Sequence, residues 1–132
     1  MSHHARGQFH VTKNAQPPYD TDDGVILGRT TIQKQFEGDL EGTSVVEMLS
    51  AIAPVPDSMA YVAIERVRGR LHGKSGSFVL QHTGSMNRGA SALNITVVPD
   101  SGTEALQGIA GSMSIDFADG MRTYAFDYTL AD

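Results

Sequence analysis

Apolar and polar residues alternate with a period of two along most of the chain. Phe78, Leu80 and His82 fall on one face of their segment, and Val79 and Gln81 fall on the other. Such alternation is typical of a β-strand with one face in a core and the other in solvent. Similar runs cover residues 8–12, 32–41, 61–71, 93–98, 112–117 and 123–130. The pattern predicts a protein made of strands, with residues 32–41 as one long strand.

Turn sequences separate these runs. Residues 73–76 and residues 118–120 each lie between two runs, and the second ends in Asp119-Gly120. An Asp-Gly pair favours a tight hairpin turn because both residues tolerate positive φ. Residues 16–24, rich in Pro and Asp, are expected to form a loop. Strands joined by hairpins predict an antiparallel sandwich or barrel, and a closed barrel of about eight strands leaves no unpaired edge.

One segment is ambiguous on residues alone. Val45, Met48, Leu49 and Ile52 have the spacing of an apolar helical stripe. The β-branched pair at 45–46 nevertheless follows directly from the preceding strand and favours strand structure. Helix and strand therefore both remain open for residues 45–51.

Composition removes several classes of function. The 132-residue chain has no Cys, which excludes disulfide scaffolds, thiolate zinc sites, iron–sulfur clusters and cysteine nucleophiles. A net charge of −5 argues against general nucleic-acid binding. The polar start and the lack of a long apolar run predict a cytoplasmic protein without membrane contact. We expect one domain over residues 1–132, with residues 1–6 frayed.

No cofactor or metal is predicted. Gly73-Lys74-Ser75 suggests a phosphate-binding loop, but Arg68 stands where that motif needs its first glycine. His10, His72 and His82 lie on separate runs, and their spacing shows none of the pairing that metal sites use.

The candidate site consists of polar and aromatic residues on faces that the alternation turns inward. A carboxylate such as Glu65 is costly to bury unless it is paired or hydrogen-bonded. We include Gln81 because a β-bulge near Gly69 or Gly73 would exchange inward and outward faces downstream. The candidate ligand-binding residues are Glu65, His82, Gln81, Tyr124, Tyr128, Phe36 and Phe78.

Two interpretations of this set remain open. Glu65, His82 and a tyrosine could satisfy one another as a core network, or they could line a ligand site. Small residues at inward positions, such as Ala63 and Gly42, would leave room for a ligand.

The opposite face of residues 61–72 carries a basic stripe that could dock an anion or an acidic partner: Arg66, Arg68, Arg70 and His72. We expect this stripe to be a solvated face paired with acidic residues on a neighbouring strand. Val62 and Ile64 add apolar surface to the same face. Outward apolar residues on a barrel predict a subunit interface, and a homodimer is the commonest case.

Three stretches carry a family resemblance: residues 65–67, 73–84 and 97–111. They resemble an uncharacterised bacterial domain-of-unknown-function family with an allene oxide cyclase-like barrel. Glu104 departs from that family's pattern, which has glycine there. The resemblance implies an all-β, closed antiparallel barrel of about eight strands, allene oxide cyclase-like or calycin-like. It also implies strand structure at residues 45–51. No activity is established for the family.

These observations lead to three functional hypotheses. The first is a barrel that binds a small, largely apolar molecule in its interior. The resemblance to allene oxide cyclases suggests the second, an isomerase or cyclase acting on a lipid-like or polyketide-like substrate. The third is an oligomeric structural module with a filled core.

Overall fold

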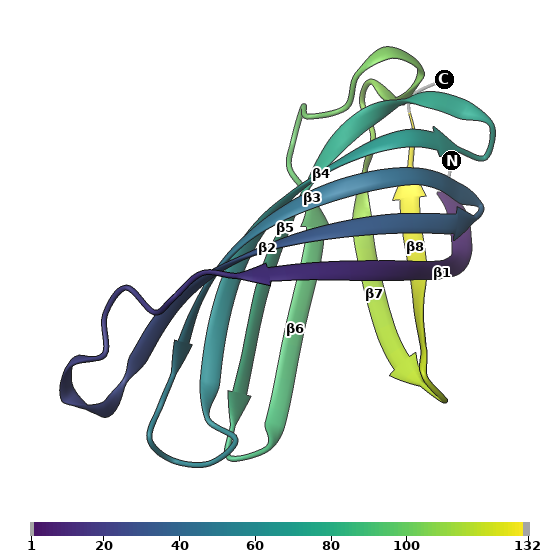
Figure 1. The fold of residues 1–132 in the computed structure, drawn as a ribbon. Coiled ribbons are helices and arrows are strands. Elements are labelled where there is room, and N and C mark those ends of the chain that lie inside the picture. Colours follow the sequence, from purple (N-terminus) through teal and green to yellow (C-terminus); the bar gives the residue numbers. More distant parts are fainter. Residues whose placement is uncertain (1, 131–132) are drawn as a thin grey trace.

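Eight antiparallel strands form a closed barrel in the computed structural model, which describes residues 2–130 (Figure 1). Each strand pairs with the next in sequence, and β8 pairs with β1 to close the barrel. The predicted fold class is therefore confirmed, as is strand structure at residues 45–51. The strands are β1 (Ser2–Ala15), β2 (Ile26–Gly38), β3 (Leu40–Ile52), β4 (Met59–Leu71), β5 (Lys74–Asn87), β6 (Ala90–Val97), β7 (Ala110–Ala118) and β8 (Met121–Thr129). Two short 3-10 turns complete the set, η1 (Asp22–Gly24) and η2 (Glu104–Leu106).

The start of the chain is ordered, and the prediction that residues 1–6 fray is wrong for residues 2–6. Ser2 to Phe9 pair with β8, and Ala5 is completely buried. The closing seam of the barrel is thus made by the segment expected to be loose. Met1 lies outside the described residues.

The predicted long strand at residues 32–41 is two strands joined by a tight turn at Asp39. Gly38 has φ +103°, a region that favours glycine, and the Asp39 carboxylate accepts a hydrogen bond from the backbone N–H of Arg6. Because the inward and outward alternation continues unbroken through this turn, the pattern alone did not reveal it. The β4–β5 turn also lies earlier than predicted, at His72-Gly73, where both residues have positive φ.

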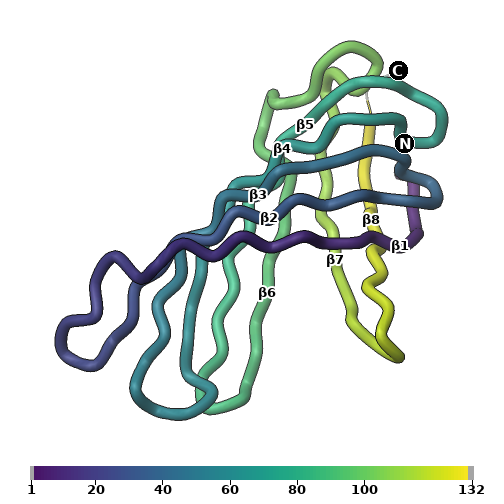
Figure 2. The backbone as a smooth tube through the Cα atoms, viewed as in Figure 1, coloured from purple at the N-terminus to yellow at the C-terminus, as the bar shows by residue number. Residues whose placement is uncertain are grey.

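The two ends of the barrel differ in packing. At one end, here called the closed end, apolar side chains such as Leu40, Leu71, Phe78 and Phe126 form a buried core. The loop between β6 and β7 packs against this end, and its Leu106 belongs to the same core. At the other end, here called the open end, the β3–β4 and β5–β6 hairpins extend beyond the β7–β8 hairpin (Figures 1 and 2).

The wall of the barrel is weakest between β6 and β7. Only Thr96 and Ser112 face each other as a ladder pair, whereas every other neighbouring pair of strands shares eight or more. Below that pair the two strands diverge toward the open end (Figure 1). Backbone pairing therefore contributes least to the barrel wall at this seam.

Two opposed glycines hold β3 and β4 close together. Gly42 and Gly69 face each other in the ladder, and a Cβ on Gly42 would overlap the carbonyl oxygen of Arg68. We predict that Gly42→Ala lowers the free energy of unfolding by about 2–3 kcal/mol through this clash. Urea denaturation measures the effect.

Gly28→Ala is the matched control for that experiment. A Cβ at Gly28 meets only the Ser50 Oγ, at an ordinary 3.6 Å. Its stability should stay within about 0.5 kcal/mol of the parent chain. Equal losses in both variants would show that close strand approach at Gly42 is not the cause.

Candidate functional site

Four polar side chains point into the middle of the barrel from four neighbouring strands. Lys34 comes from β2, Ser44 from β3, Glu65 from β4 and His82 from β5; together they are called the polar cluster. Each occupies an inward position in its strand's alternation, so the sheet register brings them together. All four are buried, and Glu65 has no exposed surface.

The Glu65 carboxylate is the centre of the polar cluster. Its Oε1 accepts hydrogen bonds from Lys34 Nζ at 3.2 Å and His82 Nε2 at 2.7 Å, while its Oε2 accepts one from Ser44 Oγ at 2.6 Å. The Lys34 ammonium also lies 4.9 Å from the centre of the Phe9 ring, where a cation–π attraction operates. Both carboxylate oxygens are therefore satisfied without water.

The donors around Glu65 decide its ionisation. Burial by itself raises the pKa of this carboxyl group, but the His82 hydrogen bond, the Lys34 charge and the Ser44 hydrogen bond together bring the pKa below its ordinary value. Glu65 is thus an anion at neutral pH, and the Lys34 ammonium balances it. Lys34 and Glu65 therefore form a buried ion pair, and Ser44 and His82 each donate a hydrogen bond to its carboxylate.

An apolar inner wall extends from the polar cluster toward the open end. The Tyr61 ring lies directly over Gly84, because a Cβ at Gly84 would overlap that ring. Burial, and then the nearby Glu65 charge, raise the pKa of the Tyr61 hydroxyl, which keeps it protonated. The remaining wall side chains are half-buried or exposed rather than covered: Ile32, Met48, Met86 and Leu93.

Of the predicted site residues, the structure brings Glu65 and His82 together. The two tyrosines lie toward the closed end and serve other purposes. The Tyr124 hydroxyl accepts the N–H of Leu40 and donates to the carbonyl of Glu37, which fastens the β2–β3 turn. The Tyr128 hydroxyl hydrogen-bonds to Nδ1 of His72 at 2.6 Å.

The predicted aromatic residues Phe36 and Phe78 are core residues. Phe36 meets Tyr124 edge-on, with ring centres 5.6 Å apart, and Phe78 stacks on Phe126 at 5.5 Å. Both are buried in the apolar core. The Lys34 ammonium of the polar cluster lies 6.0 Å from the centre of the Phe36 ring.

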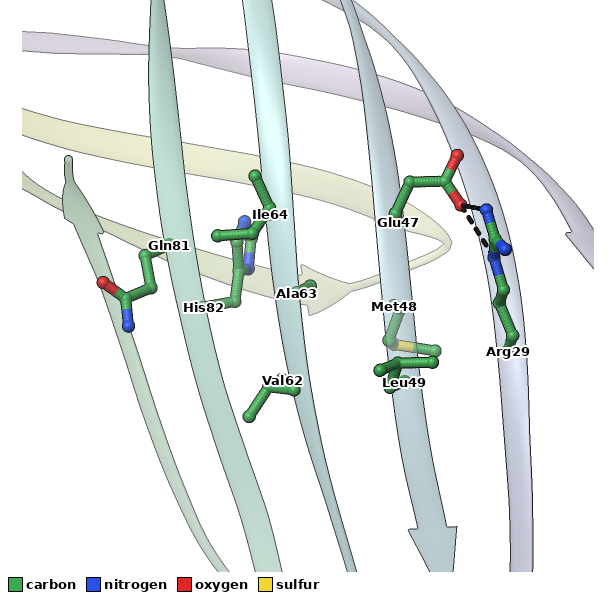
Figure 3. A pocket seen from close by; sticks show the side chains of 9 residues that line it. All are labelled: Arg29, Glu47, Met48, Leu49, Val62, Ala63, Ile64, Gln81 and His82. Carbon is green, nitrogen blue, oxygen red and sulfur yellow. Dashed lines mark hydrogen bonds and ion pairs between the residues drawn. The ribbon is translucent and has the colours of Figure 1, made fainter. Parts of the chain in front are cut away.

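Gln81 points to the outer surface, so its inclusion in the interior set is corrected. The β4–β5 register runs without interruption from Leu71 to Met59, and no bulge exchanges the faces. Gln81 instead borders an outer groove of about 390 Å³ over strands β2–β5 (Figure 3). The groove is mostly apolar and is lined by Arg29, Glu47, Met48, Leu49, Val62, Ala63, Ile64, Gln81 and His82.

Lys34 and Ser44 belong to the polar cluster but were not among the predicted site residues. The signal for Lys34 was present, because it lies between Ile32 and Phe36 on an otherwise apolar face. A lysine at an inward position implies a buried anion nearby. Ser44 gave no such signal, since a small hydroxyl fits either face of a strand.

Within residues 2–130, no three His, Asp or Glu side chains are grouped so that they could hold a metal ion. His10 instead contacts Glu37 on the exterior, and His72 contacts Tyr128. No helix in this range is long and apolar enough to cross a membrane.

Comparison with known proteins identifies the family. Residues 5–128 match the sequence model of DUF3224, a family of proteins of unknown function. The chain belongs to the DUF3224 family. A crystal structure of a DUF3224 protein of unknown function from Shewanella oneidensis MR-1 is 41% identical, with a TM-score of 0.94 and full coverage of both chains. Among proteins with curated descriptions, none matches the chain.

The predicted resemblance to an uncharacterised bacterial family is thereby confirmed. The neighbouring DUF3224 structure has the same fold along the whole chain. Family membership adds no activity, substrate or partner, because the family is defined as one of unknown function. The function has to be argued from the residues inside the barrel.

The state of Glu65 leads to a prediction about pH. Its pKa is lower in the folded than in the unfolded chain, so its stabilising contribution is present above about 4.5 and is lost as the pH falls through the folded value. Glu65→Gln should cost about 3–5 kcal/mol at pH 7, because Lys34 is left buried without a counter-charge. The variant should also lose less stability on acidification than the parent chain does.

Denaturant unfolding at neutral and acidic pH measures both effects. Glu41→Gln is the control, because Glu41 forms an exposed ion pair with Arg70. This change should cost at most about 1 kcal/mol and leave the pH profile as it is. If Glu65→Gln behaves like Glu41→Gln, the polar cluster is not the ionised network described above.

Proposed function

We propose that this protein binds a small, largely apolar molecule inside the open end of the barrel, with the polar end of that molecule against the polar cluster. One observation carries the proposal: a saturated ion pair lies buried beneath an inner wall that is apolar and only partly covered. Interior sites of this kind, mostly apolar with a few placed polar groups, are typical of small-molecule binding.

The energetic cost of the polar cluster supports a role beyond folding. Replacing a buried ion pair by well-packed apolar residues is often neutral or stabilising. The closed end already supplies an apolar core, including Phe78, Leu80 and Phe126, which forms without the charges of Lys34 and Glu65. Orienting a bound ligand would be a functional reason to retain the charges of Lys34 and Glu65 inside the barrel.

The exposed state of the inner wall supports the same proposal. Leu93 is 41% exposed, and Met48 and Tyr61 are half-buried although they point inward. Covering such apolar surface removes it from water and is favourable by roughly 25 cal/mol per Å².

A second candidate function is an isomerase or cyclase acting on a lipid-like or polyketide-like substrate. The observation that favours it is the 2.7 Å contact between Glu65 and His82, because a carboxylate that holds an imidazole prepares it to take a proton. Chemical conversion of a bound compound distinguishes this candidate from simple binding.

A third candidate is a structural module that acts as a homo-oligomer, with a dimer favoured. Val45, Leu49, Val62 and Ile64 leave apolar surface exposed on the outside of β3 and β4. Such surface is typical of subunit contacts. This candidate needs no interior ligand.

A binding screen tests the leading proposal. Native mass spectrometry with fatty acids, fatty alcohols and terpenoid alcohols should reveal a complex of one ligand per chain. Met48→Gln should weaken binding about tenfold, because a polar amide replaces a thioether of similar shape on the inner wall. Leu49→Gln is the control, since the next residue along the strand points outward and should leave affinity unchanged.

Two results would contradict the proposal. The first is that no compound of the panel binds the parent chain. The second is that Leu49→Gln weakens binding as much as Met48→Gln does, which would place the ligand in the outer groove.

A further inference from the structure

The polar cluster also indicates what kind of polar end the ligand carries. Resting on the binding function proposed above, we infer that the polar end is an uncharged hydroxyl group that donates a hydrogen bond to Nδ1 of His82. The barrel then takes alcohols with an apolar body in preference to carboxylates, amines, ethers or esters of the same size.

The first step is the tautomer of His82. Its Nε2 lies 2.7 Å from the ionised Glu65 carboxylate, an acceptor, so Nε2 carries the proton. Lys34 already balances the charge of Glu65, so a second positive charge on His82 would lie buried without compensation. A neutral imidazole with its proton on Nε2 presents a lone pair at Nδ1.

The second step is that Nδ1 is available. It has no hydrogen-bond partner among residues 2–130, whereas Nε2 does. Within the same residues no fully buried side-chain nitrogen or oxygen lacks a partner, so Nδ1 keeps some accessible surface. His82 occupies an inward position on β5 and is only 4% exposed overall, so the accessible surface of Nδ1 is small.

The third step is the set of groups around this nitrogen. In the sheet register His82 lies between Ala63 on β4 and Ile95 on β6, two apolar neighbours on the same inward face. Ala63 is small, and neither neighbour offers a hydrogen-bond donor from its side chain. An acceptor in apolar surroundings discriminates strongly between ligands that donate and ligands that cannot.

The charge balance excludes the other polar ends. A carboxylate would add a second negative charge near Glu65 and direct lone pairs at the lone pair of Nδ1. An ammonium group would add a positive charge near Lys34, which is already paired. An ether oxygen is an acceptor only, so it would leave Nδ1 unsatisfied. A hydroxyl group satisfies the acceptor and leaves the buried charge at zero.

A matched set of ligands tests this inference. Decanol, decanoate and decyl methyl ether share nearly the same apolar chain and differ in the polar end. Isothermal titration at pH 7.5 should show decanol binding about tenfold more tightly than the ether, and decanoate binding more weakly still.

Variants of His82 locate the preference. His82→Phe should remove the difference between decanol and the ether, because its ring has no acceptor. His82→Gln should retain part of it, since an amide can donate to Glu65 and accept from the ligand. Gln81→Ala, a neighbouring change on the outer face, should leave the preference as it is in the parent chain.

The outcomes separate the two proposals. Failure of all three ligands, and of the wider panel, would overturn the binding function itself. Binding of the ether or of decanoate to the parent chain as tightly as decanol would overturn the hydroxyl inference while leaving the binding function standing. A preference that persists in His82→Phe would also overturn it. If His82→Phe does not fold, the comparison in the parent chain still decides.

Discussion

A single buried carboxylate ties four strands of this barrel together. Glu65 on β4 accepts hydrogen bonds from side chains on β2, β3 and β5, and one of these donors brings the positive charge that makes the burial tolerable. Each donor reaches the carboxylate only because the register of its strand is correct. A shift of one residue would turn Lys34 or His82 to the solvent and leave Glu65 unpaired. The polar cluster therefore demands one register as well as satisfying its own charges.

The rest of the structure divides around this cluster. At the closed end, aromatic and aliphatic side chains fill the interior, and Tyr124 holds the β2–β3 turn. At the open end, the longer strands continue past the cluster with an inner wall that nothing in the described chain covers completely. The filled core and the partly covered apolar wall thus lie at opposite ends of one barrel. The weakly paired strands β6 and β7 diverge toward the open end (Figure 1).

The sequence correctly indicated which side chains face the barrel interior. It did not indicate which of these side chains contact one another there. Period-two alternation correctly placed Glu65 and His82 on inward faces, because each residue's direction follows from its own strand. Grouping them with Tyr124 and Tyr128 would have required knowing how far along the barrel each inward residue lies. That depends on register between strands distant in sequence, such as Gly7 facing Tyr124. The turn at Asp39 escaped detection for a related reason, since it preserves the alternation.

The proposed preference for a hydroxyl group depends on His82 being neutral with its proton on Nε2. Nitrogen-detected NMR of the ¹⁵N-labelled imidazole at neutral pH measures this directly, with the His82→Gln spectrum assigning the signal. We expect a protonated Nε2 and an unprotonated Nδ1 in the free protein, and a change in the Nδ1 chemical shift when decanol is added. A ring protonated on both nitrogens, or on Nδ1 alone, would contradict it.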